Sequence, residues 1–346
     1  MPQTIQAQID GLVSHLDRQR STVFDVTVSS VDATLLLQGA VLERTQHAAV
    51  LKLAHSHASG AVRDELVILL ESHQYDWAVV RWSVADVRAQ PTRAAELISE
   101  ASYGESVEVL RNQGGWSQIR QSDGYIGWIS QHGLCPGAAR YRDEATHVIA
   151  ARWRPLVGLE GSQVGLLPWG IALPVLEFRD GLAFFMSPDG LPCTIEADAL
   201  IQIEDRPAQT SAGVSEMLAQ ISQFIGVPYL WGGTTPYGFD CSGLAQAAYR
   251  WMGLPLPRDA DQQAQQGTEV TRDALQAGDL LFWAVNRNNE QRTQNINHVS
   301  IALDGEQMIH ANQYHWGVSI DRIAEVQSRY EVNDDPGLVA IRRLVE

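Results

Sequence analysis

Hydrophobic residues recur with both helical and strand-like spacing over the first part of the chain. Residues 4–19 place apolar side chains at helical spacing, and so does the segment from His47 to His57. Three strand-like runs accompany these helices and begin near Val23, Ala33 and Glu65. The order helix, strand, strand, helix, strand predicts an N-terminal α/β module over residues 1–79.

The pattern changes near residue 80, where short segments of alternating hydrophobic and polar residues are separated by turns that contain glycine. Short strands at close, regular spacing are typical of a small antiparallel barrel, which we expect over residues 80–135. Residues 136–206 repeat these strand-like segments and turns less regularly and predict a second, degenerate barrel. Trp116 and Trp128 are expected in the core of the first barrel rather than on a ligand-binding surface.

The last part of the chain, residues 213–346, places helices before strands. One helix is expected to start at Ser215, and a second carries Leu244, Ala248 and Trp251 on one face. Five strands are then expected, at residues 279–285, 298–302, 306–311, 318–321 and 338–342. Helices followed by an antiparallel sheet make this part an α+β domain.

Composition and charge restrict the classes of function. The chain has 346 residues, of which 45% are hydrophobic, and this length allows two to four modest domains. A net charge of −16 and the lack of a basic run argue against nucleic-acid binding. No apolar run is long enough to cross a bilayer, and the N-terminal residues carry no export signal. We therefore expect a cytoplasmic protein, or a periplasmic or secreted one if the chain is truncated.

The cysteines and histidines offer no metal or disulfide pattern. The three cysteines are an odd number and are widely spaced, so Cys135 and Cys193 are expected to be passive. The N-terminal histidines do not have the spacing of a metal site; they are His47, His55, His57 and His73. No metal and no cofactor are expected, and the oligomeric state is not predicted.

Cys241 is the residue around which the chemistry is predicted. A loop rich in glycine and aromatic residues starts at Tyr229 and runs directly into Cys241, which opens the helix that carries Leu244. The N–H groups and the dipole of a helix N-terminus favour the thiolate, the form that attacks carbonyl carbons. A buried structural cysteine is the alternative, and only a base elsewhere in the chain decides between the two.

Two histidines downstream provide a candidate base. His298 and His310 lie in strand-like runs on either side of Asp304-Gly305, which predicts a β-hairpin. A two-residue turn would put the histidines on opposite faces. A three-residue loop would pair Ala302 with Glu306 and set the two histidines directly opposite each other on one face. In that register the second histidine would hold the ring of the first, while the first takes the proton of the cysteine.

These segments resemble the NlpC/P60 family of cell-wall cysteine peptidases over roughly residues 215–346. The resemblance rests on the aromatic-Gly-Gly loop from Tyr229, on Asp240-Cys241-Ser242-Gly243, on Pro257-Arg258, on Gly278-Asp279, on His298-Val299 and on His310. It implies a papain-like catalytic domain with Cys241 as nucleophile, His298 as base, His310 as third member and Tyr229 beside the oxyanion. Asp240, Ser242 and Trp231 are implied substrate-binding residues. The polar loop from Asn286 to Asn297 is longer than in members that follow the family pattern more closely.

Residues 80–135 resemble bacterial SH3-like domains through their Gly-Glu-x-Val and Gly-Trp steps. Residues 1–79 weakly resemble BON-type domains, although an unrelated α+β module fits them as well. Two barrels ahead of an NlpC/P60 domain resemble the γ-D-glutamyl-L-diamino acid endopeptidases that recycle muropeptides. This resemblance implies peptidoglycan stem peptides or muropeptides with a free N-terminal L-Ala as substrates, cut between D-γ-glutamate and the diamino acid through a thioester.

The same resemblance implies residues that would recognise the free N-terminus. Tyr103 of the first barrel would close the cleft, Asp240 would pair with the substrate ammonium, and Glu96 would supply a second carboxylate. Arg258 would either take part in binding or pair with a carboxylate of the protein. Two other functions fit the sequence, namely a wall- or peptide-binding protein with an inactive catalytic domain, and an acyltransferase that uses the same thioester.

Overall fold

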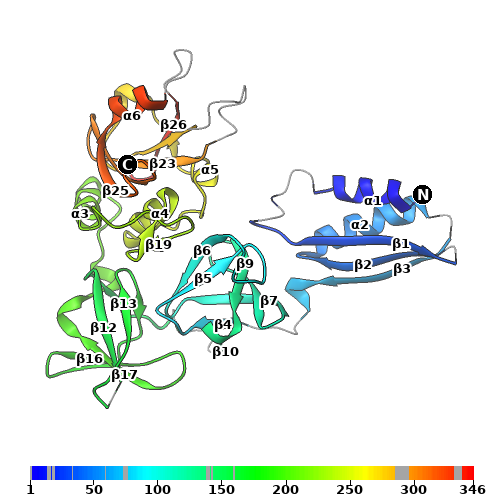
Figure 1. The fold of residues 1–346 in the computed structure, drawn as a ribbon, viewed down its shortest axis with the longest axis horizontal. Helices are drawn as coiled ribbons and strands as arrows, with labels where there is room; N and C mark the ends of the chain where they lie inside the picture. Colours follow the sequence, from blue (N-terminus) through cyan, green and yellow to red (C-terminus); the bar gives the residue numbers. More distant parts are fainter. Residues whose placement is uncertain are drawn as a thin grey trace.

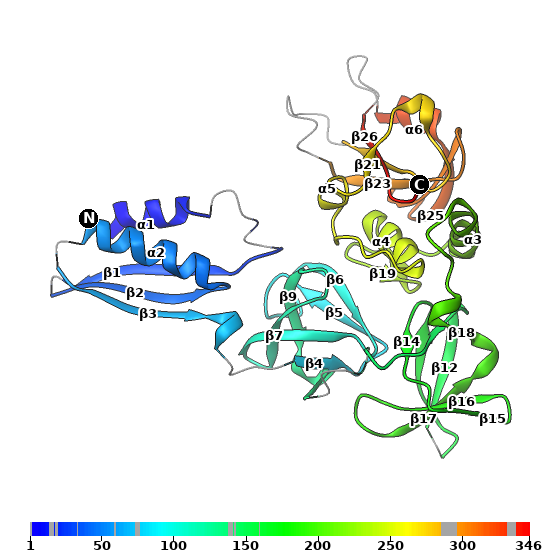
Figure 2. The ribbon, with the colours of Figure 1, turned by 180° about the vertical axis from the view of Figure 1, so that it is seen from behind.

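The computed structural model describes the chain at residues 2–13, 17, 20–32, 34–58, 60–72, 77–137, 141, 143–158, 160–284, 296–330 and 337–346. Figure 1 shows four parts in chain order, which are a module of two helices on a sheet, two β-rich parts, and a C-terminal part with helices packed on a sheet. The N-terminal module projects to one side of the other three parts (Figures 1 and 2). His73 and most of the loop from Asn286 to Asn297 lie outside the described residues.

The N-terminal module has the order of elements that the hydrophobic pattern predicts. Its elements are α1 (Pro2–Gly11), β1 (Phe24–Val31), β2 (Thr34–Val41), α2 (Arg44–His57) and β3 (Val62–Ile68). β1 pairs antiparallel with β2, and β2 pairs parallel with β3. Ile5, Ile9, Val50 and Ala54 recur at helical spacing and are buried in one cluster with the sheet.

The first β-rich part is one strongly curved, seven-stranded sheet with the strand order β10-β4-β7-β8-β9-β5-β6. Its strands are β4 (Trp77–Val80), β5 (Val84–Arg88), β6 (Leu97–Ser102), β7 (Ser106–Gln113), β8 (Trp116–Arg120), β9 (Ile126–Ser130) and β10 (Leu134–Pro136). Alternate residues such as Val87, Val107 and Ile119 fill the interior. Trp128 is buried as expected, whereas Trp116 is only partly buried.

The second β-rich part contains two sheets, with the strand orders β14-β11-β18 and β13-β12-β17-β16-β15. Its strands are β11 (His147–Ile149), β12 (Trp153–Gly158), β13 (Gln163–Pro168), β14 (Ala172–Leu173), β15 (Glu177–Arg179), β16 (Leu182–Met186), β17 (Pro192–Glu196) and β18 (Leu200–Gln202). Ile149, Leu167 and Phe185 lie in its core, and Tyr103 of the preceding part joins the same cluster.

The C-terminal part packs helices against a six-stranded sheet of order β21-β26-β22-β23-β24-β25. The helices are α3 (Ser211–Ser222), α4 (Cys241–Trp251), α5 (Ala260–Gln263) and α6 (Ile323–Tyr330). The strands are β19 (Thr234–Thr235), β20 (Gly238–Phe239), β21 (Thr268–Glu269), β22 (Leu280–Trp283), β23 (His298–Ala302), β24 (Gln307–Asn312), β25 (Gly317–Arg322) and β26 (Leu338–Arg343). The helix expected from Ser215 begins earlier, because the Thr210 side chain accepts the N–H of Gly213 and caps it.

α4 lies against β23 and β24, so the start of the helix meets the strands that carry the two histidines. Leu244, Ala248 and Trp251 of α4 are buried in the main core of this part. In the described part of the chain, no helix combines the length and the apolar character needed to span a bilayer.

Candidate active site

The start of α4 is fixed by the residue that precedes Cys241. One oxygen of Asp240, Oδ1, accepts the N–H of Gly243 at 2.7 Å, and Oδ2 accepts the N–H of Gly232 at 2.9 Å. A side chain at position 243 would not fit, because its Cβ would lie 2.1 Å from the carbonyl oxygen of Gly233. Asp240 therefore joins the glycine-rich loop to the helix and holds Cys241 at the first helical position.

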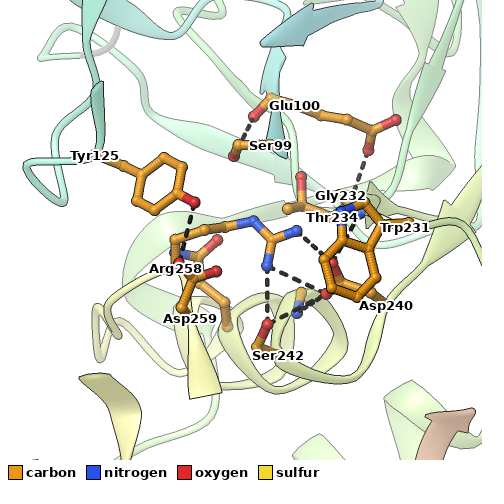
Figure 3. Close-up of polar contacts among 12 residues, drawn as sticks. Ser99, Glu100, Tyr125, Trp231, Gly232, Thr234, Asp240, Ser242, Arg258 and Asp259 are labelled. Carbon is orange, nitrogen blue, oxygen red and sulfur yellow. Dashed lines mark hydrogen bonds and ion pairs between the residues drawn. The ribbon is translucent and has the colours of Figure 1, made fainter. Parts of the chain in front are cut away.

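A buried arginine completes the support of this helix start (Figure 3). Arg258 is 1% exposed, and its guanidinium donates to both oxygens of Asp240, at 2.5 Å and 3.1 Å. The same guanidinium donates to Ser242 Oγ at 2.9 Å. Arg258 is thus the partner of a carboxylate of the protein, one of the two predicted roles. Because a buried arginine and aspartate neutralise each other, removing either would leave the other charge buried and unpaired.

The two histidines lie on one face, although the predicted register is wrong. β23 pairs with β24 through Ile301–Ile309 and Ala302–Met308, not through Ala302 and Glu306. The connection is therefore longer than three residues, and continuing the register places His298 and His310 diagonally across the two strands rather than directly opposite. The rings still meet, because His298 Nε2 lies 2.8 Å from His310 Nδ1.

An aspartate that the sequence analysis did not single out extends this chain of hydrogen bonds. Asp321 Oδ2 lies 2.8 Å from His310 Nε2, and Asp321 Oδ1 lies 3.0 Å from His315 Nε2. The hydrogen bond from His310 is the main reason that the pKa of Asp321 falls to about 2, so this carboxylate is ionised.

An ionised Asp321 determines where the histidine protons lie. A carboxylate only accepts hydrogen bonds, so Nε2 of His310 carries a proton and its Nδ1 is an acceptor. Nε2 of His298 must then donate to that acceptor, which leaves the lone pair of His298 on Nδ1. The three residues Asp321, His310 and His298 together therefore present a neutral imidazole with a basic Nδ1.

Cys241 is 9% exposed and lies beside the start of β23, where backbone N–H groups of Val299 and Ser242 favour its thiolate. Burial, and secondly the Asp240 carboxylate, outweigh these groups and raise the pKa of the thiol to about 12. Burial and the neighbouring His310 lower the pKa of His298 well below its usual value. Both shifts favour the uncharged thiol and the uncharged imidazole, so the environment does not favour the thiolate that the helix N-terminus led us to expect.

Cys241 opens into a cleft of about 740 Å³ between the first β-rich part and the C-terminal part. Among the predicted site residues, the cleft is lined by Tyr229, Trp231, Asp240, Cys241, Ser242 and Glu96. Trp231 Nε1 donates to Glu96 Oε1 at 2.7 Å, so these two exposed side chains of different parts meet at the rim. Burial, and then the nearby Cys241, raise the pKa of Tyr229, whose hydroxyl stays protonated.

The prediction that Tyr103 closes the cleft is wrong. Tyr103 is 4% exposed and packs in the core of the second β-rich part, with its ring edge-on to that of Tyr141 at 6.1 Å. It follows the last residue of β6, and Gly104 with φ of +77° turns the chain there, so the side chain faces the second β-rich part. The tyrosine of the first β-rich part that lines the cleft is Tyr125, whose hydroxyl donates to Asp259 at 3.0 Å.

A second carboxylate missed by the sequence analysis contacts the loop that precedes Cys241 (Figure 3). Glu100 of β6 is 6% exposed, and its Oε2 accepts the N–H of Thr234 at 2.8 Å and the hydroxyl of Thr235 at 3.0 Å. Burial raises the pKa of Glu100 to about 7 despite these hydrogen bonds. Glu100 therefore connects the first β-rich part to the loop that caps α4. Within the described residues, no group of His, Cys, Asp and Glu is arranged to hold a metal ion.

Comparison with known proteins agrees with this geometry. Residues 226–333 match the NlpC/P60 family, and residues 83–134 match the bacterial SH3 domain. The γ-D-glutamyl-L-lysine dipeptidyl-peptidase of Bacillus subtilis (strain 168) is 30% identical over 254 residues, which cover 71% of this chain and 80% of that protein. A protein of the same name from Bacillus cereus is 24% identical over 258 residues, which cover 70% and 76%.

A solved structure shares the fold over most of the chain. The crystal structure of an NlpC/P60 family protein from Bacillus cereus aligns with a TM-score of 0.68 and 21% identity, covering 78% of this chain and all of that one. The resemblance inferred from the motifs is confirmed. The chain therefore belongs to the NlpC/P60 family, and it is a hydrolase of the peptidase class with a bacterial SH3 domain ahead of its catalytic part.

Proposed function

We propose that this peptidase hydrolyses the amide bond between D-γ-glutamate and the diamino acid of peptidoglycan-derived peptides that carry a free N-terminal L-Ala. The observation that carries the proposal is the hydrogen-bonded series from Asp321 through His310 to His298, together with Cys241, which contacts the backbone of Val299 next to His298 and lines the cleft. Relatives named γ-D-glutamyl-L-lysine dipeptidyl-peptidases support the class of bond.

The pKa shifts of Cys241 and His298 favour proton transfer during the attack over a thiolate formed beforehand. His298 Nδ1 would take the proton of the Cys241 thiol as the sulfur attacks the carbonyl carbon, because burial favours the uncharged form of both groups. The backbone N–H of Cys241 and the Tyr229 hydroxyl would stabilise the oxygen that becomes negative. His298 would then give its proton to the leaving amine, which breaks the amide bond and leaves a thioester on Cys241.

Water would complete the reaction with the same base. His298 Nδ1 would accept a proton from water as its oxygen attacks the thioester carbonyl, and the proton would return to the leaving sulfur of Cys241. The products are a peptide with a free carboxylate and the released diamino acid. An acyltransferase would differ only in the acceptor that replaces water, and no contact of the described residues favours such an acceptor.

The carboxylates of the cleft support recognition of a free N-terminus. Glu96 is exposed at the rim, and the ammonium of L-Ala would pair with it. Asp240 already accepts two N–H groups of Arg258, two backbone N–H groups and the Ser242 hydroxyl, which occupy its lone pairs, so it would border the ammonium while Glu96 supplies the direct ion pair. Ser242 and Trp231 would border the same end of the peptide.

The test uses matched peptides that differ only at the N-terminus. L-Ala-γ-D-Glu-L-Lys and its N-acetylated form are incubated with the protein, and the initial rates of lysine release are compared. The proposal predicts release from the free peptide and at least about tenfold less from the acetylated one, because acetylation removes the charge that would pair with Glu96 and a hydrogen bond to a charged group contributes about 1.5–3 kcal/mol. Equal rates for the two peptides would contradict recognition of the free terminus.

A further inference from the structure

The N-terminal module reaches the catalytic cleft through the segment around Arg20. The module lies outside both matched family segments, the first of which begins at residue 83. Its helices and sheet project away from the peptidase part, whereas the chain leading into β1 points toward α5 (Figures 1 and 2). Asp17 and Arg20 line the same cleft as Cys241.

Arg20 joins two walls of this cleft. Its carbonyl oxygen accepts the N–H of Ile126, in β9 of the first β-rich part, at 2.8 Å. Its Nη1 donates to Asp259 Oδ2 at 2.9 Å. Nη1 and Nη2 donate to the two oxygens of Asp261 at 2.8 Å and 2.9 Å, a bidentate pair with a fixed direction. A residue held to one wall by its backbone and to the other by its side chain spans the space between them.

The bridge lies on the side of the cleft where the substrate N-terminus is proposed to bind. Asp259 directly follows Arg258, which holds Asp240 at the start of α4. Tyr125 of the first β-rich part donates to the same oxygen of Asp259 at 3.0 Å, so Arg20 and Tyr125 meet at one carboxylate. A peptide extended beyond Asp240 in this direction would meet the bridge.

The module holds this segment in place by packing on the first β-rich part. Val23 and Leu42 of the module form a buried cluster with Leu110 and Ile126. Asp17 accepts the backbone N–H of Arg20 at 3.0 Å and also its Nε. The bridge is therefore anchored at both ends on packed structure, as a wall of a binding site must be.

The charges around Arg20 are compatible with a cationic substrate terminus. The carboxylates of Asp17, Asp259 and Asp261 all contact the guanidinium, so they outnumber its single positive charge. An ammonium group bound nearby is then attracted rather than repelled by the cluster as a whole. The bridge limits the length of the substrate without opposing its charge.

We propose that Arg20 is a specificity-determining residue that closes the cleft beyond Asp240 and excludes peptides with residues ahead of the N-terminal L-Ala. This inference rests on the proposed function. It gives the N-terminal module a role as the third wall of the substrate cleft, beside the first β-rich part and the peptidase part.

The test compares kcat/KM for L-Ala-γ-D-Glu-L-Lys with kcat/KM for the same peptide extended by glycine at its N-terminus. Both peptides carry a free ammonium, so the ratio of the two values reports length rather than charge. Wild type is expected to favour the shorter peptide strongly. Arg20→Ala should raise the relative kcat/KM of the extended peptide about tenfold, which corresponds to about 1.4 kcal/mol.

Two further variants guard against an indirect effect. Asp261→Ala removes the bidentate anchor and should give the same relaxation, and the double variant should add little to either single one. Asp25→Ala is the matched control, because it breaks an exposed pair with Arg111 between the module and the first β-rich part, lies outside the cleft and should keep the wild-type ratio. Melting temperatures measured on all variants show that each one is folded.

The outcomes separate this inference from the proposed function. An unchanged ratio in Arg20→Ala and Asp261→Ala, with the shorter peptide still cleaved by wild type, would overturn the role of Arg20 alone. Failure of wild type to cleave either peptide would overturn the proposed function and, with it, this limit on substrate length.

Discussion

Glu100 provides a stability prediction whose size follows from the structure. The pKa of this buried carboxyl is raised from 4.5 to about 7, chiefly by burial. The folded protein therefore binds the proton more tightly than the unfolded chain does. The resulting stability is complete below about pH 4.5 and is lost as the pH rises through 7, because the folded state must then hold a buried carboxylate. The full loss is about 3 kcal/mol, at about 1.4 kcal/mol for each pKa unit.

Glu100→Gln removes this titration while keeping an oxygen that accepts from Thr234 and Thr235. Relative to wild type, the variant should gain about 2.5 kcal/mol in free energy of unfolding between pH 5 and pH 8. Urea unfolding at both pH values measures this difference, and other titrating groups cancel because both proteins contain them. Glu216→Gln, at an exposed position of α3, is the control and should show little change. A difference that is the same at both pH values would refute the argument.

Three predictions concern the catalytic residues. His298→Ala should lower kcat at least about 100-fold in a peptide-cleavage assay, whereas His310→Gln should lose less, because an amide can still accept the N–H of His298. Asp321→Asn should lower kcat about 100-fold or more, since an amide that donates to His310 Nε2 reverses the tautomers of both histidines. Asp304→Asn in the exposed turn is the control and should keep the wild-type kcat. An unaffected kcat in Asp321→Asn would count against the proposed tautomers. In a kcat/KM–pH profile, activity should fall on the acid side as the Cys241–His298 pair takes up a proton. The midpoint should lie below about 6.5, because the pKa of His298 is lowered. A midpoint above 7 would contradict the lowered pKa of His298.

Local patterns identified the helix of the nucleophile and the strands of the histidines. Leu244, Ala248 and Trp251 are buried together as their spacing predicts, and β23 has the predicted bounds, His298 to Ala302. The hairpin register failed because of its turn. Asp304 Oδ1 accepts the N–H groups of both Glu306 and Gln307 at 2.7 Å, which lengthens the connection beyond the three residues assumed.

Contacts between distant segments could not be predicted from local patterns. Arg20 meets Asp259 across 239 positions, and Glu100 meets Thr234 across 134. Tyr103 lies at a turn, where the direction of a side chain depends on which neighbouring part packs against it. Asp321 was within reach of the sequence, because a strand that follows the two histidines and carries an acidic residue offers a partner for one of them.

Product analysis shows whether Cys241 cleaves the amide bond between D-γ-glutamate and the diamino acid. Wild type and Cys241→Ala are incubated with L-Ala-γ-D-Glu-L-Lys in water enriched in ¹⁸O, and the products are analysed by mass spectrometry. Wild type should release free lysine and an L-Ala-γ-D-Glu dipeptide with one ¹⁸O in its new carboxylate, and the variant should release neither product. Cleavage of a different bond, or undiminished cleavage by Cys241→Ala, would contradict the proposed reaction.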